Sequence, residues 1–338
     1  MKFIDKILYF INSIFAICLL LSLIVPYFPP QKFPILATFS LIVSPLLLVN
    51  VFFFLFWLLR VKRQLLLSLI ILIISFVQFN QFYQFDFSKE IPLKNNHLKV
   101  MSYNVRLFNL YEWIKDENTQ TNITNLIEKE NPDILSFQEY HTKKEVRLSQ
   151  YQYNYVKLRG KSNKSGQAIY SKYPIINKGS LDFENTFNNA IFVDIVKQED
   201  TIRIYNIHLE SLQVNPDDVD FNQENSERLL RRIASSFKIQ QVQMDEVVKH
   251  VEQSPYKTII TADLNNTAFS YVYRRLKKDK NDTFAESGKG LGKTFSFKKI
   301  PLRIDFILAD KEMQVQHFTT HTEKYSDHHP ISTTLTWE

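Results

Sequence analysis

The stretch TIITADLN, residues 258–265, decides the architecture that we expect for most of this chain. It begins as a β-branched apolar run, which is typical of a buried strand. It ends on Asp263 and, after one small step, Asn265. Because side chains alternate along an extended chain, this carboxylate and carboxamide are expected to point the same way. Such a pair can hold a water molecule and steady a phosphoryl oxygen, whereas the plainer interpretation is a turn.

Short β-rich runs alternate with helical stretches on both sides of this segment. Helices are predicted over residues 119–129 and 226–251. Strands are predicted over residues 98–105, 133–140, 151–158, 167–170, 190–196, 201–211, 258–262, 294–297, 303–308, 315–320 and 331–336. This mixture indicates a layered α/β domain over residues 98–338.

Polar side chains recur where the predicted strands end, which is where sites collect in layered α/β folds. They are Asn104, Glu139, His208, Asp263, Asn265, Asp305, Asp327 and His328. Each one has a plainer interpretation: a turn asparagine, a solvated edge, a core histidine, an ion pair with Arg303 or loop polarity. The joint pattern is explained less well in this way, because burying several ionisable groups is costly unless they meet a cation or each other.

The oxygen donors among these residues indicate a hard divalent cation. Glu139 and Asp327, with Asn104 nearby, suit Mg²⁺ or Mn²⁺, which take few protein ligands and keep several waters. Zinc fits less well, because the sequence has no HExxH motif and its lone cysteine, Cys18, lies in an apolar span.

The remaining residues indicate hydrolysis of a phosphate ester. His208 and His328 are candidates for proton transfer and phosphate contact, and Asp263 can orient or deprotonate a water. No GxSxG elbow is present, which argues against a serine hydrolase. The stretch GKGLGKT, residues 288–294, lacks the spacing of a phosphate loop and is predicted to be a flexible loop before a strand.

Three apolar spans precede the α/β part, at residues 7–28, 33–59 and 65–77, the last with a polar-aromatic tail to residue 85. A helix needs ~20 apolar residues to cross a bilayer, and the first two spans contain no charge. The alternative for the first span is a signal peptide, but no small-x-small cleavage site follows it. We therefore expect a membrane region of three transmembrane helices over residues 1–85 and a linker over residues 86–97.

Positive charges predict the orientation of these helices. They lie before the first span and between the second and third, while the first loop has only one: Lys2, Lys6, Arg60, Lys62 and Arg63, against Lys32. This places the N-terminus in the cytoplasm and, after an odd number of crossings, residues 98–338 outside. We expect a multi-pass protein of the cytoplasmic (inner) membrane with an extracytoplasmic domain. A net charge of +6 suits an anionic partner, although a Lys-rich composition gives the same value.

The ordered motifs resemble the endonuclease/exonuclease/phosphatase superfamily, which includes deoxyribonucleases, apurinic endonucleases, neutral sphingomyelinases and inositol-phosphate phosphatases. The matching stretches are SYNV (102–105), SFQEY (136–140), SGQAIYSKYPI (165–175), NIHLES (206–211), TADLN (261–265), RIDFIL (303–308) and SDHHP (326–330). Each motif is weak alone, but all of them occur in the family's order over residues 98–338.

This resemblance implies an α/β (α+β) four-layer sandwich, in which two mixed β-sheets pack face to face with helices outside. It implies that Asn104, Glu139 and Asp327 surround the Mg²⁺ or Mn²⁺ ion. The stretch from Tyr103 to Arg106 lacks the tryptophan and the downstream glycine typical of apurinic endonucleases, which makes that subgroup a poorer match.

The resemblance also implies roles for the other residues. Asp263 would set up the attacking water, and Asn265 would stabilise charge on the phosphoryl oxygens. His208 would act on the leaving-group side, as an acid or as a phosphate contact. Asp305 would orient His328, which would bind the scissile phosphate.

The hypothesis that follows is a membrane-anchored, metal-dependent phosphoesterase. Its substrate would be a phosphate ester, either diester or monoester, in a nucleic acid, a phospholipid head group or an inositol phosphate. No obligate protein partner is evident beyond the lipid bilayer. The alternatives are a catalytically silent phosphate-binding module tethered to the membrane, and a membrane protein whose outer part docks a partner.

Overall fold

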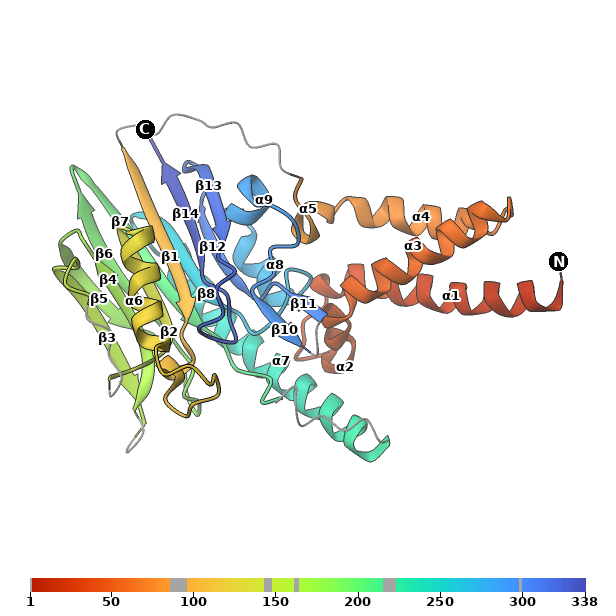
Figure 1. Ribbon diagram of the computed structural model, residues 1–338, viewed down its shortest axis with the longest axis horizontal. Coiled ribbons are helices and arrows are strands. Elements are labelled where there is room, and N and C mark those ends of the chain that lie inside the picture. The colour runs from red at the N-terminus through yellow and green to blue at the C-terminus, as the bar shows by residue number, and fades with distance from the viewer. Residues whose placement is uncertain (1, 86–95, 143–147, 161–163, 215–222, 298–299) are drawn as a thin grey trace.

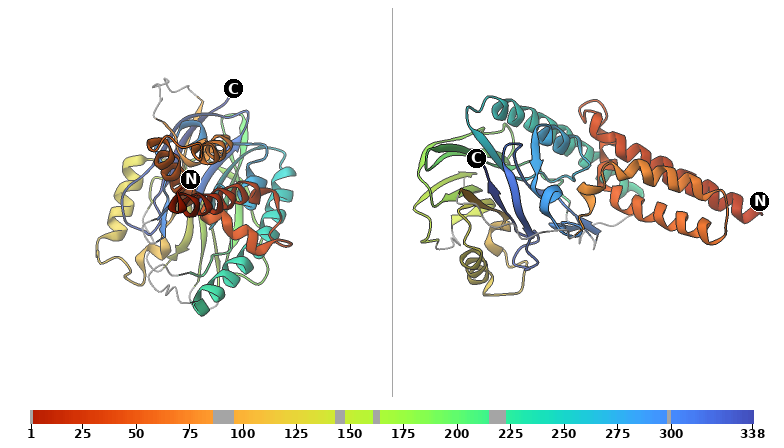
Figure 2. Two further views of the ribbon diagram at one scale, coloured as in Figure 1. Left: turned by 90° about the vertical axis from the view of Figure 1, so that its right-hand side faces the viewer. Right: turned by 90° about the horizontal axis from the view of Figure 1, so that it is seen from above.

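The computed structural model describes residues 2–85, 96–142, 148–160, 164–214, 223–297 and 300–338 (Figure 1). It shows a β-sandwich domain from which a narrow bundle of N-terminal helices projects (Figures 1 and 2). Most of the predicted linker, residues 86–95, lies outside the described residues.

Two six-stranded sheets form the domain. In spatial order the first contains β13 (Gln314–Thr320), β14 (Ile331–Thr336), β1 (His97–Asn104), β2 (Ile134–His141), β4 (Ser165–Ser171) and β3 (Tyr153–Arg159). The second contains β5 (Ile175–Ser180), β6 (Asn189–Lys197), β7 (Asp200–His208), β8 (Lys257–Asp263), β12 (Asp305–Asp310) and β9 (Lys280–Asp282). Both sheets are mixed, because β1 pairs with β2 and β7 with β8 in parallel while their other neighbours run antiparallel.

β-branched side chains fill the space between the sheets. Val100 and Ile134 of the first sheet and Ile204 and Ile259 of the second belong to one fully buried cluster. Helix α6 (Thr119–Glu130) covers the outer face of the first sheet, while α7 (Gln223–Glu252) and α8 (Tyr271–Lys277) cover the second. The shorter α9 (Thr283–Ser287) and the ribbon of β10 (Phe295–Phe297) and β11 (Ile300–Leu302) complete the domain. The predicted four-layer sandwich is confirmed.

Strand register brings the polar strand ends to one edge. In the second sheet, His208 of β7 lies beside Asp263 of β8, and Asp263 lies beside Asp305 of β12. In the first sheet, Asn104 of β1 lies beside Gln138 of β2. The segments that carry chemistry therefore lie next to one another although they are far apart in the sequence.

The N-terminal part contains three long helices. These are α1 (Phe3–Ile24), which a turn extends through Val25–Tyr27, then α3 (Val43–Leu59) and α4 (Leu65–Phe76), and they pack on one another side by side. The short elements α2 (Pro34–Ala37), the turn Thr38–Leu41 and α5 (Phe79–Phe82) lie at the domain end.

The three helices differ in whether they are long enough to cross a membrane. Within the described residues, Phe3–Tyr27 is long and apolar enough to cross a membrane. A second span is obtained if Pro34–Leu41 and Val43–Leu59, bent by 64°, count as one. The 12 residues of α4 extend over only about 18 Å, so a third crossing would need the residues that follow it.

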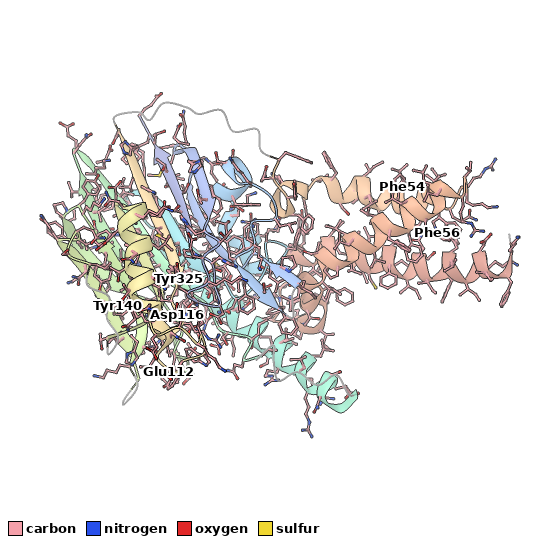
Figure 3. The ribbon with its side chains drawn as sticks, in the orientation of Figure 1. Phe54, Phe56, Glu112, Asp116, Tyr140 and Tyr325 are labelled. Carbon is pink, nitrogen blue, oxygen red and sulfur yellow. The ribbon has the colours of Figure 1, made fainter. Side chains whose placement is uncertain are left out.

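The bundle has a largely apolar core that also contains buried polar side chains, and its outer surface is apolar. Asp5, Asn12 and Asn50 are almost fully buried, and Asp5 accepts a 2.5 Å hydrogen bond from Arg60. In contrast, Phe10 and Phe52 are 66% and 62% exposed. Figure 3 labels two further aromatic side chains of α3, Phe54 and Phe56. Large apolar side chains exposed in such number are uncommon on a surface that faces water.

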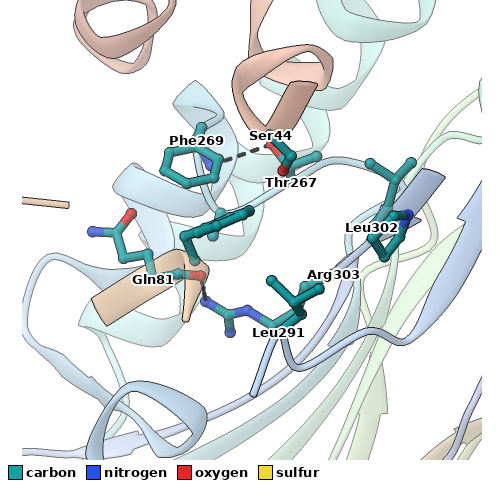
Figure 4. A pocket seen from close by; sticks show the side chains of 10 residues that line it. Ser44, Gln81, Thr267, Phe269, Leu291, Leu302 and Arg303 are labelled. Carbon is teal, nitrogen blue, oxygen red and sulfur yellow. Dashed lines mark hydrogen bonds between the residues drawn. The ribbon is translucent and has the colours of Figure 1, made fainter. Parts of the chain in front are cut away.

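Hydrogen bonds fix the bundle to the domain. Ser40 donates to the side chain of Asn266 at 3.1 Å, and the hydroxyl of Thr267 donates to the carbonyl of Ser40 at 2.8 Å. Arg303 donates to the carbonyl of Gln81 at 3.1 Å, across a small cavity lined by both parts (Figure 4). The two parts therefore meet through specific polar contacts.

We expect Arg303→Ala to destabilise the junction strongly. Arg303 also donates to the carboxylate of Asp282 at 2.9 Å, and both side chains are buried. Without the guanidinium, Asp282 keeps an unpaired buried charge, which costs about 3–5 kcal/mol. Thermal unfolding of the full chain in detergent measures the loss. The control Arg231→Ala removes a largely exposed arginine and should have little effect. An equally small effect of both substitutions would contradict this interpretation.

Candidate active site

The carboxamide of Asn104 connects the two sheets. At the end of β1, its Nδ2 donates to Oδ2 of Asp263 at 2.9 Å and to Oε1 of Glu139 at 3.2 Å. Asp263 belongs to the other sheet and is fully buried. Two carboxylates from different sheets therefore meet at one neutral amide group.

A β-bulge directs Glu139 toward the site. The register of β2 against β4 shifts between Phe137 and Tyr140, and Glu139 has φ of 50°. This left-handed conformation is uncommon for a residue other than glycine, and bulges often re-aim a side chain next to a functional site. As a result, the Glu139 side chain is 35% exposed, while Gln138 and Tyr140 are buried.

His208 faces the same two carboxylates without hydrogen bonding to them. Its Nε2 lies 3.7 Å from Oδ2 of Asp263 and 3.9 Å from Oε1 of Glu139. This nitrogen is buried and has no hydrogen-bond partner among the residues that the structure describes. A buried polar atom of this kind calls for an explanation, and a bound water or ligand supplies one.

His328 and Asp305 form a buried pair on the opposite side of Asp263. Nδ1 of His328 lies 3.0 Å from Oδ2 of Asp305 and 3.8 Å from Oδ2 of Asp263. Burial disfavours the charged ring, but the carboxylates of Asp305 and Asp263 outweigh this and raise the pKa of His328 well above its usual value. These carboxylates therefore favour the charged form of the ring.

Asp327 lies beside Asn104 in the loop before β14. The hydroxyl of Ser326 donates to the carbonyl of Asn104 at 2.8 Å and to Oδ1 of Asp327 at 3.2 Å. Oδ2 of Asp327 is 3.2 Å from Nη1 of Arg106, whose guanidinium stacks on the ring of Trp113. The Asp327 carboxylate is 31% exposed and accessible from solvent.

Asn265 lies in a turn, so the alternation expected for an extended chain does not apply. Strand β8 ends at Asp263, and Asn265 has φ of 47°. Its backbone amide donates to Oδ1 of Asp263 at 2.9 Å, while its side chain donates to the carbonyl of Leu209 at 3.0 Å. The expectation that both side chains point the same way because they alternate was wrong, although the two residues do touch.

All of the residues predicted for the site thus lie together, but several supporting residues were not predicted. Thr294, the last residue of GKGLGKT, is buried, and its hydroxyl accepts from the amides of Ile304 and Asp305 at 3.0 and 3.2 Å. Beneath the site, Gln138 donates to Asn206 at 2.8 Å between the sheets. Polar residues in an apolar strand pattern were the only signal for this layer in the sequence.

The donor set fits a divalent cation on the Glu139 side of the site. Asp263, Asp305 and His328 place ligand atoms within 4.8 Å of one another, but Nδ1 of His328 is already engaged with Asp305. Glu139 and Asp327 instead offer hard, partly exposed oxygen atoms. The carboxylates of Glu139 and Asp263 both contact the uncharged carboxamide of Asn104, which does not balance their negative charge. A cation bound there would balance it.

Comparison with known proteins identifies the family. Residues 101–328 match the Endonuclease/Exonuclease/phosphatase family. The chain belongs to this family. Its members are hydrolases that act on phosphoester bonds, and this chain is one of them. Residues 5–82 match a separate domain of unknown function, and no curated protein matches the chain.

Solved structures of the same family have the same fold. A family protein from Bacteroides thetaiotaomicron shares 16% identity over 73% of this chain and 100% of its own, with a TM-score of 0.54. TDP2 from D. rerio, complexed with a single-strand DNA product, shares 16% identity over 71% and 98%, with a TM-score of 0.54. The human Nocturnin catalytic domain, with bound sulfate, shares 15% identity over 73% and 96%, with a TM-score of 0.54.

We expect Glu139→Gln to weaken Mn²⁺ binding by about tenfold or more, because a carboxamide carries no charge to attract the cation. Paramagnetic resonance of free Mn²⁺ at increasing protein concentration measures the affinity. Glu246→Gln, which changes an exposed carboxylate on α7, is the matched control and should bind as the unaltered chain does. Equal affinity in both variants would place the ion elsewhere.

Proposed function

We propose that this family member is a membrane-anchored phosphoesterase that uses Mg²⁺ or Mn²⁺ and a water oriented by Asp263. The observation that carries the proposal is the convergence on one oxygen atom. Oδ2 of Asp263 lies 2.9 Å from the amide of Asn104, 3.7 Å from His208 and 3.8 Å from His328. A buried carboxylate among these groups is suited to hold a water and take up its proton.

The two histidines have different tasks in this proposal. His328 uses Nδ1 for Asp305, which leaves Nε2 of the charged ring to bind a phosphoryl oxygen. His208 has a buried Nε2 without a partner, which suits it to donate a proton to the leaving oxygen or to contact the phosphate. Proton uptake is thereby assigned to Asp263, proton delivery to His208, and phosphate binding to His328.

Asn104, Glu139 and Asp327 would hold the divalent ion. When bound, the ion supplies positive charge that neutralises the phosphoryl oxygens. Asn265 is placed beside Asp263 by its backbone amide, and it would stabilise the charge on those oxygens.

The substrate class remains that expected from the sequence: an ester in a nucleic acid, a phospholipid head group or an inositol phosphate. The D. rerio TDP2 structure holds a DNA product, which favours nucleic acid as the first substrate to test. A catalytically silent binding module is the alternative. Nε2 of His208 argues against a silent module, because this buried nitrogen has no hydrogen-bond partner among the described residues. Leaving it unsatisfied costs stability, which a protein without a ligand at this position has no reason to retain.

Asp263→Asn and His208→Ala should each lower turnover of bis-p-nitrophenyl phosphate by roughly 10²- to 10⁴-fold, the range of general acid–base catalysis. Chelation should abolish the activity of the unaltered chain, and Mg²⁺ or Mn²⁺ should restore it. Circular dichroism checks that each variant is folded, and Glu246→Gln again serves as the control. Unchanged turnover in a folded Asp263→Asn variant would contradict the proposed role of Asp263 in orienting the water.

The anchoring proposal draws on the surface of the N-terminal bundle. Its exposed phenylalanines and isoleucines would face lipid, while the buried Asp5, Asn12 and Asn50 each form a side-chain hydrogen bond inside it. The match of residues 5–82 to a family of its own supports a separate unit. α4 and α5 together would complete the third crossing.

The positive charges lie at the end of the bundle far from the domain. Arg60 contacts Asp5 there, which brings the N-terminal lysines and the loop between α3 and α4 to the same end (Figure 1). By the positive-inside rule this end would be cytoplasmic, and the catalytic domain would lie on the extracytoplasmic side of the inner membrane.

A fusion of green fluorescent protein to Glu338 tests this orientation. We expect the fusion to be dark when exported, and a fusion of alkaline phosphatase at the same residue to be active. A second pair of fusions within the loop after Arg60 should give the opposite result. A bright fusion at Glu338 would contradict the topology and leave the phosphoesterase proposal intact.

A further inference from the structure

A cleft of about 710 Å³ lies where the bundle meets the domain. The ends of α1 and α4 form one wall, with Tyr27, Val77 and Gln78. Helix α8 and the residues after it form the other. None of the residues assigned above to the ion, the water or the phosphate lines this cleft. It is therefore separate from the candidate active site.

The domain wall of this cleft is strongly basic. Six lysines and arginines line the cleft against a single carboxylate, Glu286. Three of these cations are paired with carboxylates outside the cleft: Arg275 with Asp245, Lys280 with Asp310, and Lys311 with Asp279.

The remaining cations are Arg274, Lys277 and Lys278. In the part of the chain that the structure describes, none of these three is among the ion pairs with a carboxylate. Arg274 instead stacks on the ring of Tyr27, with its guanidinium carbon 4.1 Å from the ring centre. Three uncompensated charges that line one cleft attract an anion, and a guanidinium suits the oxygens of a phosphate.

The opposite wall carries apolar side chains beside Gln78 and Gln81, and the apolar part continues onto the surface of the bundle. Val77 is 83% exposed, and Ile24, the last residue of α1, is 37% exposed. These residues lie at the domain end of the helices, at the level where acyl chains would give way to head groups. A soluble phosphate would use the basic wall alone, whereas a lipid would use both.

We propose that this cleft binds the phosphate head group of an anionic phospholipid from the membrane that holds the bundle. The inference rests on the proposed membrane anchoring. The lipid phosphate would lie between Arg274, Lys277 and Lys278, and its acyl chains would run along α1 and α4. The bound lipid would thereby hold the domain against the bilayer surface.

Native mass spectrometry of the full chain, purified in detergent, tests the proposal with phosphatidylglycerol and phosphatidylcholine at equal concentration. We expect phosphatidylglycerol to bind preferentially. The triple variant R274Q/K277Q/K278Q should lose that preference by roughly tenfold or more, because each charge near an anionic head group contributes about fivefold. The matched control K115Q/K129Q/K178Q removes three exposed lysines elsewhere on the domain and should keep it.

Two further measurements show whether the cleft binds a lipid or a free phosphate ion, and whether the triple variant is folded. Inorganic phosphate at 10-fold excess should not displace the lipid; displacement would show a site for a free anion instead. Melting temperatures in the same detergent show that the triple variant is folded. Unchanged lipid preference in a folded triple variant overturns the inference.

The outcome can be separated from failure of the proposed function. Loss of membrane insertion would be seen in the fusion experiment, and loss of catalysis in the Asp263→Asn assay. If both of those succeed and lipid preference is absent, only the lipid site is wrong.

Discussion

The structure depends on one buried carboxylate, that of Asp263. It is fully buried at the end of β8, and a buried charge is tolerated only where hydrogen bonds and opposite charges surround it. One oxygen accepts from the amide of Asn265 and the other from Asn104, with His208 and His328 close by. Because Asn104 comes from the opposite sheet, the two sheets must meet at this edge for the carboxylate to be stabilised. Folding and site assembly are therefore the same event.

Strand direction explains why only this edge carries the site. Parallel neighbours deliver their carboxyl ends to the same place, which aligns His208 with Asp263, and antiparallel β12 begins where β8 ends, which adds Asp305. Buried β-branched residues on the inner faces hold both sheets at a fixed separation, so the side chains at the edge keep fixed distances. Precision at the site comes from the core beneath it.

The sequence predicted what depends on pattern: the strands, their polar ends and the order of the motifs. It did not predict features that depend on contacts between distant segments. The bulge at Glu139 arises from its pairing with β4, and Asn265 turns because Leu209 and Asp263 accept its hydrogen bonds. Thr294 looked like part of a loop, because nothing local shows that its hydroxyl will meet the amide of Asp305. The conformational propensity of a short segment does not indicate which distant residues it will hydrogen bond with.

The bundle also contributes to the site, because its contacts reach the loop that follows β8. Within this loop Asn265 touches Asp263, while its neighbours Asn266 and Thr267 exchange hydrogen bonds with Ser40 of the bundle. Gln240 of α7 connects the same residues by accepting from Asn266. Removing the bundle would break both hydrogen bonds to Ser40 and expose Asn266 and Thr267 to water, at a net cost of about 0.5–1.5 kcal/mol for each bond. The loop would then relax, and Asn265 with it. The N-terminal helices are thus part of the framework around Asp263.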